Sequence, residues 1–146
     1  MKFTSTRLTT HALHKQPLSY RYYKTAAGIL KFSHTDNGIY QAEFCDEKPM
    51  TTVTQIPHQL YLVGTDFQIA VWNAALQIPE GKTATYQEIA QMIGKPKAWR
   101  AVANALANNK IAYFIPCHRV VRTNGTLGGY KWGIEKKQKL LSAEKL

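Results

Sequence analysis

The chain has 146 residues, 45% of them apolar, and a formal net charge of +10 at neutral pH. This length suits one domain or two small lobes, and the apolar content excludes a disordered chain. No apolar run approaches the roughly 20 residues that a membrane-spanning helix needs, so the sequence predicts no membrane partner.

No secretory signal is expected in the N-terminal segment, because residues 1–16 lack an apolar core region. The first 35 residues contain no acid, which is faintly typical of an organelle transit peptide, but ordinary N-terminal variation is the preferred interpretation. We therefore expect an intracellular protein whose two cysteines, Cys45 and Cys117, are both reduced.

Residues 18–48 are expected to form β-structure. Residues 20–32 and 38–44 are partly β-branched or aromatic, with roughly alternating polarity. Asn37-Gly38 between them is a strong signal for a tight turn, so a hairpin is predicted. Residues 48–64 contain two prolines and few periodic apolar positions, and they are expected to be a linker.

A helix is predicted over residues 66–78, with Asp66 as its N-cap and with Pro79 and Gly81 ending it. Its apolar positions on one side are Phe67, Val71 and Ala74, with Ala70 and Ala75 nearby.

Two further helices are predicted close together. Residues 85–94 show capping-box spacing at Thr85 and Glu88, and Gly94 stands where a left-handed residue is expected. Residues 95–109 form the next helix. The pair makes a helix-turn-helix, an arrangement that any small helical core can contain.

The C-terminal part contains a buried segment, a turn-rich segment and a last helix. Residues 111–121 predict an extended apolar segment bent by a proline, and residues 123–130 are rich in turn formers. Residues 133–144 predict a helix that keeps its lysines outside. The apolar residues expected to face the core are Ile134, Leu140 and Leu141.

The positive charge is concentrated in this C-terminal part. From Lys95 onward there are 11 Lys or Arg residues and only two acids, Glu135 and Glu144, a net charge of +9 in 52 residues. Such a surface is typical of polyanion binding, although a solvated basic face has the same pattern.

The candidate chemical groups are Cys117 and His118, in the stretch FIPCHRVV. A thiolate is the reactive form of cysteine, and a nearby histidine lowers its pKa, but an inert buried thiol is the alternative. In an extended segment the two side chains diverge, so a water would bridge them. Glu144 is a candidate to orient the imidazole, or else a solvated carboxylate at a helix end.

No metal site is predicted, because no second Cys/His pair with ligand spacing exists. The remaining histidines are expected to be surface or structural residues: His11, His14, His34 and His58.

The stretches RAVANALANN, IPCHRVV, GTLGGYKWG and LLSAE closely resemble the O-6-alkylguanine-DNA alkyltransferases, the methylated-DNA–protein-cysteine methyltransferases. The resemblance covers residues 65–146, and upstream GIL…GIY…F is similar to a shortened N-terminal lobe of that family. It implies an α/β fold of the α+β kind. A small β-rich lobe and linker would occupy residues 1–64, and a mostly helical DNA-binding and active-site domain residues 65–146.

The resemblance implies direct DNA repair without a cofactor. The Cys117 thiolate would attack the alkyl carbon on guanine O6. The alkyl group would end on the sulfur, the guanine would be restored, and the protein would not react again. By the family pattern His118 relays the thiol proton through a water, Glu144 orients His118, and Asn109 braces the active-site turn.

The implied partner is double-stranded DNA that contains 6-O-alkylguanine, bound by a monomer in the cytoplasm, at the nucleoid of a bacterium or in a eukaryotic nucleus. The nucleotide would be flipped out of the duplex. Arg100 would fill the gap in the base stack and Tyr86 would press the neighbouring phosphate. Ala98 and Arg119 complete the DNA-contacting set. Without the resemblance, a surface arginine and a core-facing tyrosine would be preferred.

The resemblance also implies a substrate pocket. Backbone carbonyls near Cys117 and Val120 would read the guanine edge, and the loop with Tyr130 and Lys131 would close over the base. The bulky Trp132 in that loop predicts a preference for methyl over benzyl adducts, unless it packs against the last helix instead.

Two positions depart from the family pattern: Trp99 stands where small residues precede the finger arginine, and Lys131 replaces a small polar residue. Three other functions stay open. A non-catalytic lesion-binding protein of the same fold is disfavoured by the retained Cys117. Nothing indicates the oxyanion hole of a thiol hydrolase, and a plain transcription factor leaves PCHRV unexplained.

Overall fold

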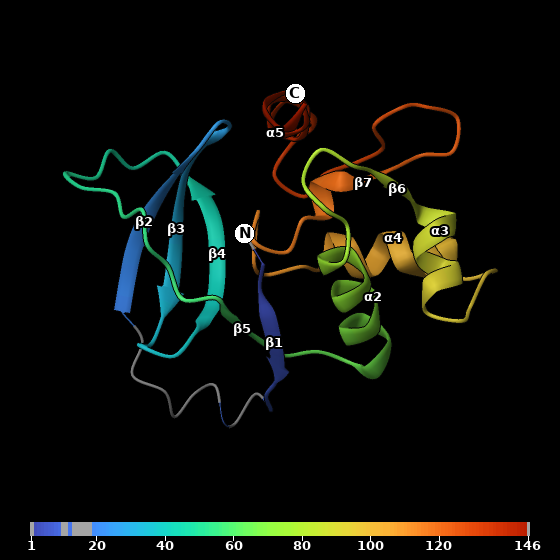
Figure 1. The fold of residues 1–146 in the computed structure, drawn as a ribbon, viewed down its shortest axis with the longest axis horizontal. Helices are drawn as coiled ribbons and strands as arrows, with labels where there is room; N and C mark the ends of the chain where they lie inside the picture. Colours follow the sequence, from blue (N-terminus) through green and yellow to red (C-terminus); the bar gives the residue numbers. More distant parts are fainter. Residues whose placement is uncertain (1, 10–11, 13–18, 146) are drawn as a thin grey trace.

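The computed structural model describes residues 2–9, 12 and 19–145. Five strands form one sheet in the order β1–β5–β4–β3–β2 (Figure 1). Their bounds are β1 (Thr4–Arg7), β2 (Ser19–Thr25), β3 (Gly28–His34), β4 (Ile39–Cys45) and β5 (Gln59–Leu62). β5 runs parallel to both β1 and β4, whereas β2, β3 and β4 are antiparallel neighbours.

The predicted hairpin is confirmed. Its turn joins β3 to β4, and the backbone N–H of Thr35 donates to the carbonyl of Gly38 at 2.9 Å. A Cβ at Gly38 would lie 2.2 Å from the ring of Tyr61, so glycine lets β5 pack closely against this turn.

The β-structure predicted for residues 20–32 consists of two strands, because the chain turns back at residues 26–27 and Gly28 adopts a φ of +133°. One expectation for this region was wrong. The expected linker, residues 48–64, contains β5, whose Leu60 and Leu62 are buried. The strand reads Gln-Leu-Tyr-Leu, and because the residue between its two buried leucines is aromatic, the sequence shows only a weak alternation of polarity.

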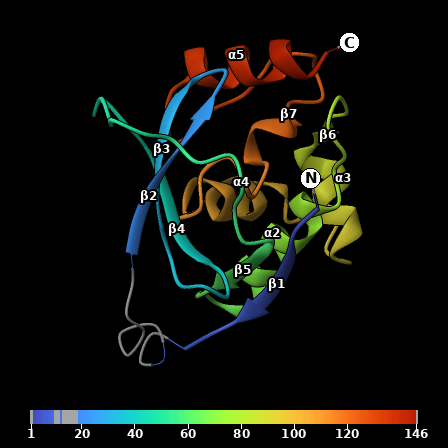
Figure 2. The ribbon, with the colours of Figure 1, turned by 60° about the vertical axis from the view of Figure 1, so that its left-hand side comes forward.

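The helical part lies beside the sheet (Figure 1), and α5 runs along the top of both parts in the view of Figure 2. Its elements are α2 (Asp66–Leu76), β6 (Ala84–Thr85), α3 (Tyr86–Met92), α4 (Trp99–Ala107), the 3₁₀ turn η1 (Cys117–Arg119), β7 (Val120–Val121) and α5 (Ile134–Glu144). The α+β fold expected from the sequence is confirmed. One hydrophobic core is formed by side chains of the sheet and of α2, α3 and α4.

The helix ends follow local capping rules. α3 has the predicted capping box: Thr85 Oγ1 accepts from the N–H of Glu88 at 3.0 Å, and Glu88 accepts from the N–H of Thr85 at 3.2 Å. The N-cap of α2 is Thr65 rather than Asp66, because Thr65 makes the same reciprocal pair with Gln68. Thr and Asp are both good N-caps, so residue type alone did not distinguish adjacent candidates.

Residues 111–121 are buried but not extended. Tyr113 adopts a left-handed φ of 70°, and the N–H of Cys117 donates to the carbonyl of Ile115 at 2.7 Å as the chain winds into η1. Ala42 of β4 holds the start of this segment through backbone hydrogen bonds to Lys110 and Ala112, both 3.0 Å. The cysteine segment is therefore anchored to the sheet.

Two residues of α5 differ in burial from the prediction. Leu140 and Leu141 are buried as expected, but Ile134 is 46% exposed at the helix start. Lys137 is completely buried, although the lysines were expected outside. Among the described residues, no helix has both the length and the apolar character to span a membrane.

Candidate active site

Cys117 is the first residue of η1 and is only 6% exposed. Its Sγ lies 3.2 Å from Nδ2 of Asn109, which donates to the sulfur. Burial raises the pKa of the Cys117 thiol to about 12, against smaller opposing effects from Asn109 and the charge of Lys137. The resting sulfur is therefore a protonated thiol at neutral pH, and it needs a base to become a nucleophile.

Asn109 connects the sulfur to the backbone. Its side chain accepts from the N–H of Ile111 at 2.9 Å and donates to the carbonyl of the same residue at 3.2 Å. Its own backbone carbonyl accepts from Nζ of Lys131 at 3.0 Å. Because Asn109 is fully buried, these bonds hold the chain before Cys117 in one conformation.

His118 and Glu144 form a buried pair. Nε2 of His118 lies 2.8 Å from Oε1 of Glu144, and the imidazole has no exposed surface. The ring stacks on Tyr113, with centroids 5.9 Å apart and planes 6° apart. Among the described residues, Nδ1 of His118 has no hydrogen-bond partner. Since the carboxylate fixes the proton on Nε2, Nδ1 carries the free lone pair.

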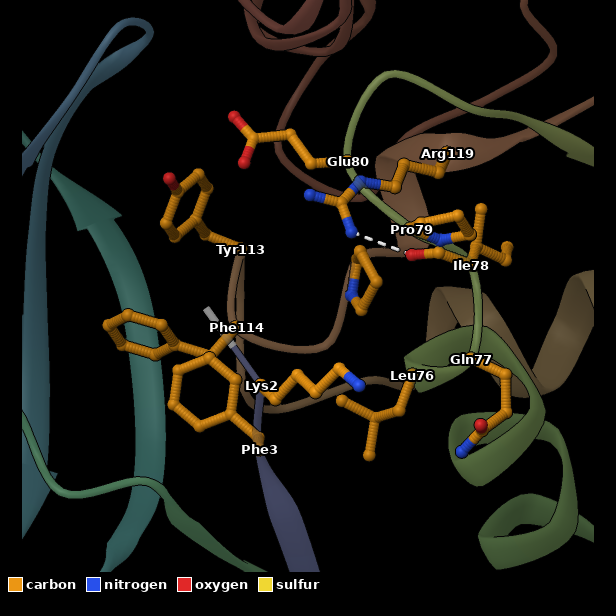
Figure 3. A pocket seen from close by; sticks show the side chains of 11 residues that line it. Lys2, Phe3, Leu76, Gln77, Ile78, Pro79, Glu80, Tyr113, Phe114 and Arg119 are labelled. Carbon is orange, nitrogen blue, oxygen red and sulfur yellow. Dashed lines mark hydrogen bonds between the residues drawn. The ribbon is translucent and has the colours of Figure 1, made fainter.

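Arg119 also binds Glu144, the partner of His118. Its guanidinium donates to Glu144 from Nε at 3.0 Å and from Nη2 at 2.9 Å, and from Nη1 to the carbonyl of Ile78 at 2.8 Å. Figure 3 shows this last bond at the edge of a hollow of about 460 Å³, to which Phe3 and Tyr113 also contribute. Arg119 thus faces Glu144, although the sequence places it among the DNA contacts.

The electrostatics of the pair favour a neutral imidazole beside an ionised carboxylate. Burial lowers the pKa of His118 below its usual range, partly offset by Glu144. Burial opposes ionisation of Glu144, but the hydrogen bonds and charges of His118 and Arg119 outweigh it and lower the carboxyl pKa. A neutral His118 can accept a proton.

Cys117 borders a pocket of about 280 Å³. The pairing of β6 with β7 brings Tyr86, at the start of α3, next to the chain that follows η1. The other side chains lining the pocket come from α4 and the loop before α5: Ala103, Leu106, Ala107, Tyr130, Lys131 and Trp132. A Cβ on Gly128 would lie 2.8 Å from the hydroxyl of Tyr86, so glycine allows this loop to approach α3.

Trp132 both lines the pocket and packs against the sheet. Its ring lies 5.4 Å from Tyr130 and 6.3 Å from Phe44 of β4, centroid to centroid. The ammonium of Lys131 lies 5.2 Å from the centre of the indole. The hydroxyl of Tyr130 is buried and has no partner among the described residues.

The family model for "6-O-methylguanine DNA methyltransferase, DNA binding domain" matches residues 66–146, more than half of the chain. The chain belongs to this methyltransferase family. The resemblance inferred from the sequence is therefore confirmed, and the cysteine, the histidine–glutamate pair and the pocket all lie inside the matched segment.

Two curated members of the family and one solved structure illustrate the relationship. The chain is 55% identical over 91 residues to the bifunctional transcriptional activator/DNA repair enzyme Ada of Escherichia coli, covering 62% of this chain and 26% of that protein. It is 50% identical over 84 residues to the methylated-DNA–protein-cysteine methyltransferase of Kluyveromyces lactis, covering 58% and 44%. The crystal structure of Mycobacterium tuberculosis OGT in complex with DNA has a TM-score of 0.71 and 33% identity, covering 86% and 92%.

The matched segments span less than half of these two curated relatives, whereas the solved structure is covered almost completely. The arrangement of sheet and helices in this methyltransferase-family chain is thus that of a solved neighbour.

The predicted DNA-contacting residues of this family member do not all lie together. Tyr86 is half-buried and borders the pocket, whereas Ala98 and Arg100 lie at the start of α4, outside the pocket lining. Arg100 is exposed and stacks over the indole of Trp99 at 5.1 Å. Val120 is buried and does not line the pocket, and its carbonyl accepts from Lys137.

Sequence reasoning missed Lys137. Its Nζ donates to the carbonyl of Val120 at 2.6 Å and to that of Gly129 at 3.0 Å. Burial lowers its pKa from 10.5 to about 8. The helical spacing of Lys137 with Leu140 and Leu141 could have indicated that it lies on the buried face.

Neither cysteine of this family member is in a disulfide, since Cys45 and Cys117 are both free. The described part of the chain contains no cluster of three or more His, Cys, Asp or Glu side chains that could hold a metal ion. Of the four other histidines, His34 is buried and His58 is exposed, while positions 11 and 14 lie outside the described residues.

Proposed function

We propose that the chain repairs DNA directly, by moving an alkyl group from O6 of guanine to Sγ of its own Cys117. One observation carries the proposal: in a member of this family, the buried sulfur borders a pocket large enough for part of a base, beside a histidine–carboxylate pair. The reaction needs no cofactor, and each protein molecule acts once.

The proposed reaction begins with proton removal. The thiol proton passes through a water to Nδ1 of His118. Nε2 keeps its own proton and donates it in the hydrogen bond to Glu144. The thiolate then attacks the alkyl carbon. The new S–C bond forms as the C–O6 bond breaks, and the electron pair moves into the base. The base then takes up one proton, which His118 releases through the water, and becomes guanine.

Asn109 and the pocket loop act as positioning groups in this proposal. The Asn109 amide donates to the sulfur and favours its anionic form. Tyr130, Lys131 and Trp132 close over the base, and backbone carbonyls near Cys117 read its edge, since the carbonyl of Val120 already accepts from Lys137. Because burial raises the pKa of the Cys117 thiol to about 12, its proton has to be transferred to His118 for the sulfur to attack.

Duplex DNA is the proposed partner, bound by a monomer. The base reaches the buried sulfur only after it is flipped out of the stack. Arg100 on α4 would fill the resulting gap and Tyr86 would press the neighbouring phosphate. The basic C-terminal part supplies the charge. Such a protein works at the chromosome, in the cytoplasm of a bacterium or in a eukaryotic nucleus.

Mass spectrometry of the protein after incubation with duplex DNA carrying 6-O-methylguanine tests the proposal. We expect one added methyl group per molecule, placed on Cys117 by peptide mapping. Cys45→Ser is the matched control and should react normally, whereas Cys117→Ser should bind the duplex without being methylated. Repeated turnovers, or methyl on another residue, would reject this function. Binding without transfer by the unaltered protein would favour the non-catalytic lesion-binding alternative.

A further inference from the structure

Trp99 is an exposed tryptophan that packing does not explain. It is the first residue of α4, 39% of its surface is exposed, and it is not among the residues packed against the hydrophobic core. It also lies outside the pocket that contains Cys117. A tryptophan that stays partly exposed keeps an apolar ring available for stacking on another molecule.

The guanidinium of Arg100 lies over the indole of Trp99. The guanidinium carbon lies 5.1 Å from the ring centre, within the range of a cation–π contact. Among the described residues, no carboxylate pairs with Arg100. Arg100 is thus held by an aromatic face and keeps its charge and its hydrogen-bond donors for another molecule.

The surroundings of this pair match a nucleic acid. The sequence contains no acid between Glu88 and Glu135, while Lys95 and Lys97 lie in the turn before α4. Basic side chains interleaved with an exposed aromatic are typical of surfaces on which bases stack. Apolar side chains also act as wedges between base steps when a protein deforms a duplex.

We propose that Trp99 and Arg100 enter the duplex as one stacked wedge, in which the indole braces the guanidinium and lies against the base step beside the flipped nucleotide. This inference rests on the proposed function, because it takes α4 to lie in a groove of the DNA. The indole restricts the guanidinium before binding, so less conformational freedom is lost when the wedge enters.

Binding to an undamaged, fluorescently labelled duplex tests the wedge without any alkyl transfer. Trp99→Ala should weaken binding roughly tenfold, as the loss of one base-stacking aromatic does, and Trp99→Phe should restore part of it. The slope of log affinity against log salt concentration should not change, since no phosphate contact is removed. Tyr20→Ala is the matched control: Tyr20 is an exposed aromatic with Lys31 5.0 Å from its ring centre, but it lies on β2.

Fluorescence supplies a readout that a purely structural role would not move. Stacking on a base should quench the emission of Trp99, so duplex DNA should quench the protein less in Trp99→Ala than in the unaltered chain. Unchanged or tighter binding by Trp99→Ala, or equal quenching, would overturn the wedge. Methyl transfer from duplex DNA that carries 6-O-methylguanine is measured separately. Its absence in the unaltered protein would reject the reaction at Cys117 and leave the wedge standing.

Discussion

Replacing Glu144 by glutamine tests whether this residue orients His118, because the substitution removes the charge and keeps the side-chain shape that packs in α5. The wild-type carboxylate accepts from His118 at 2.8 Å and from Arg119 at 2.9 and 3.0 Å. Glutamine has nearly the same shape but carries no charge, and its amide can turn a donor towards Arg119. We expect an imidazole that is less firmly held, with its proton no longer fixed on Nε2.

The size of the stability loss follows from burial. Glu144 is 8% exposed and the Arg119 side chain 16%, so removing one charge leaves a nearly buried guanidinium without its counter-ion. Breaking such a pair costs about 3–5 kcal/mol, although the bond from Arg119 to Ile78 is retained. At roughly 2–4 °C per kcal/mol for a domain of about this size, the melting temperature should fall by about 10 °C.

The transfer rate should fall further than this stability loss explains. A well-placed general base contributes roughly 10²–10⁴-fold, so we expect the single-turnover methyl-transfer rate of Glu144→Gln to fall about a hundredfold while undamaged duplex is bound normally. The assay follows methylated protein over time, well below the melting temperature of the variant. Glu135→Gln changes an exposed acid in the first turn of the same helix and is the control. A folded Glu144→Gln that transfers methyl at the wild-type rate would refute the orienting role.

The other predictions concern pH, the buried lysine and pocket size. The pKa of Glu144 is depressed in the folded protein, so the stability it contributes is present above about pH 4.5 and is lost below it; acid unfolding of Glu144→Gln should lack this component. Lys137 has a folded pKa of about 8 against 10.5, so stability should rise between these pH values, and a Lys137→Met variant that retained the rise would contradict this origin. The same variant leaves the carbonyls of Val120 and Gly129 unpaired and should transfer methyl more slowly, measured in the single-turnover assay. Trp132→Gly should shift the ratio of benzyl to methyl inactivation rates towards benzyl by about tenfold or more, and an unchanged ratio would exclude Trp132 as a pocket wall.

Features governed by neighbouring residues were predictable from the sequence. The turn at Asn37-Gly38 and the capping box of Thr85 and Glu88 depend on groups at most three residues apart, and both appear in the structure. The strands β1 and β5 were not predicted. Their pairing joins Thr4 to Gln59, and each strand has only four residues, so no local pattern records it.

In the candidate site, too, contacts between distant parts of the chain could not be predicted. The resemblance named Cys117, His118 and Glu144, and the extended segment expected at residues 111–121 predicted only that the side chains of Cys117 and His118 diverge, with a water between them. The winding of η1 and the left-handed Tyr113 set their directions, and that winding depends on backbone bonds to Ala42 in the sheet. A contact across about seventy residues of sequence cannot be inferred from the apolar stretch itself.

In α5, helical spacing indicates which residues are buried, although two of them are charged residue types that usually lie at the surface. Lys137, Leu140, Leu141 and Glu144 follow one another at intervals that place them on the same helix face, and all four are buried. The two charged residues of this face contact the chain at two different places after Cys117. Glu144 holds His118 just after the cysteine, and Lys137 holds Gly129 in the loop that borders the pocket. The geometry around Cys117 therefore depends on the docking of α5, and substitutions that loosen this helix should impair the site without touching the sulfur.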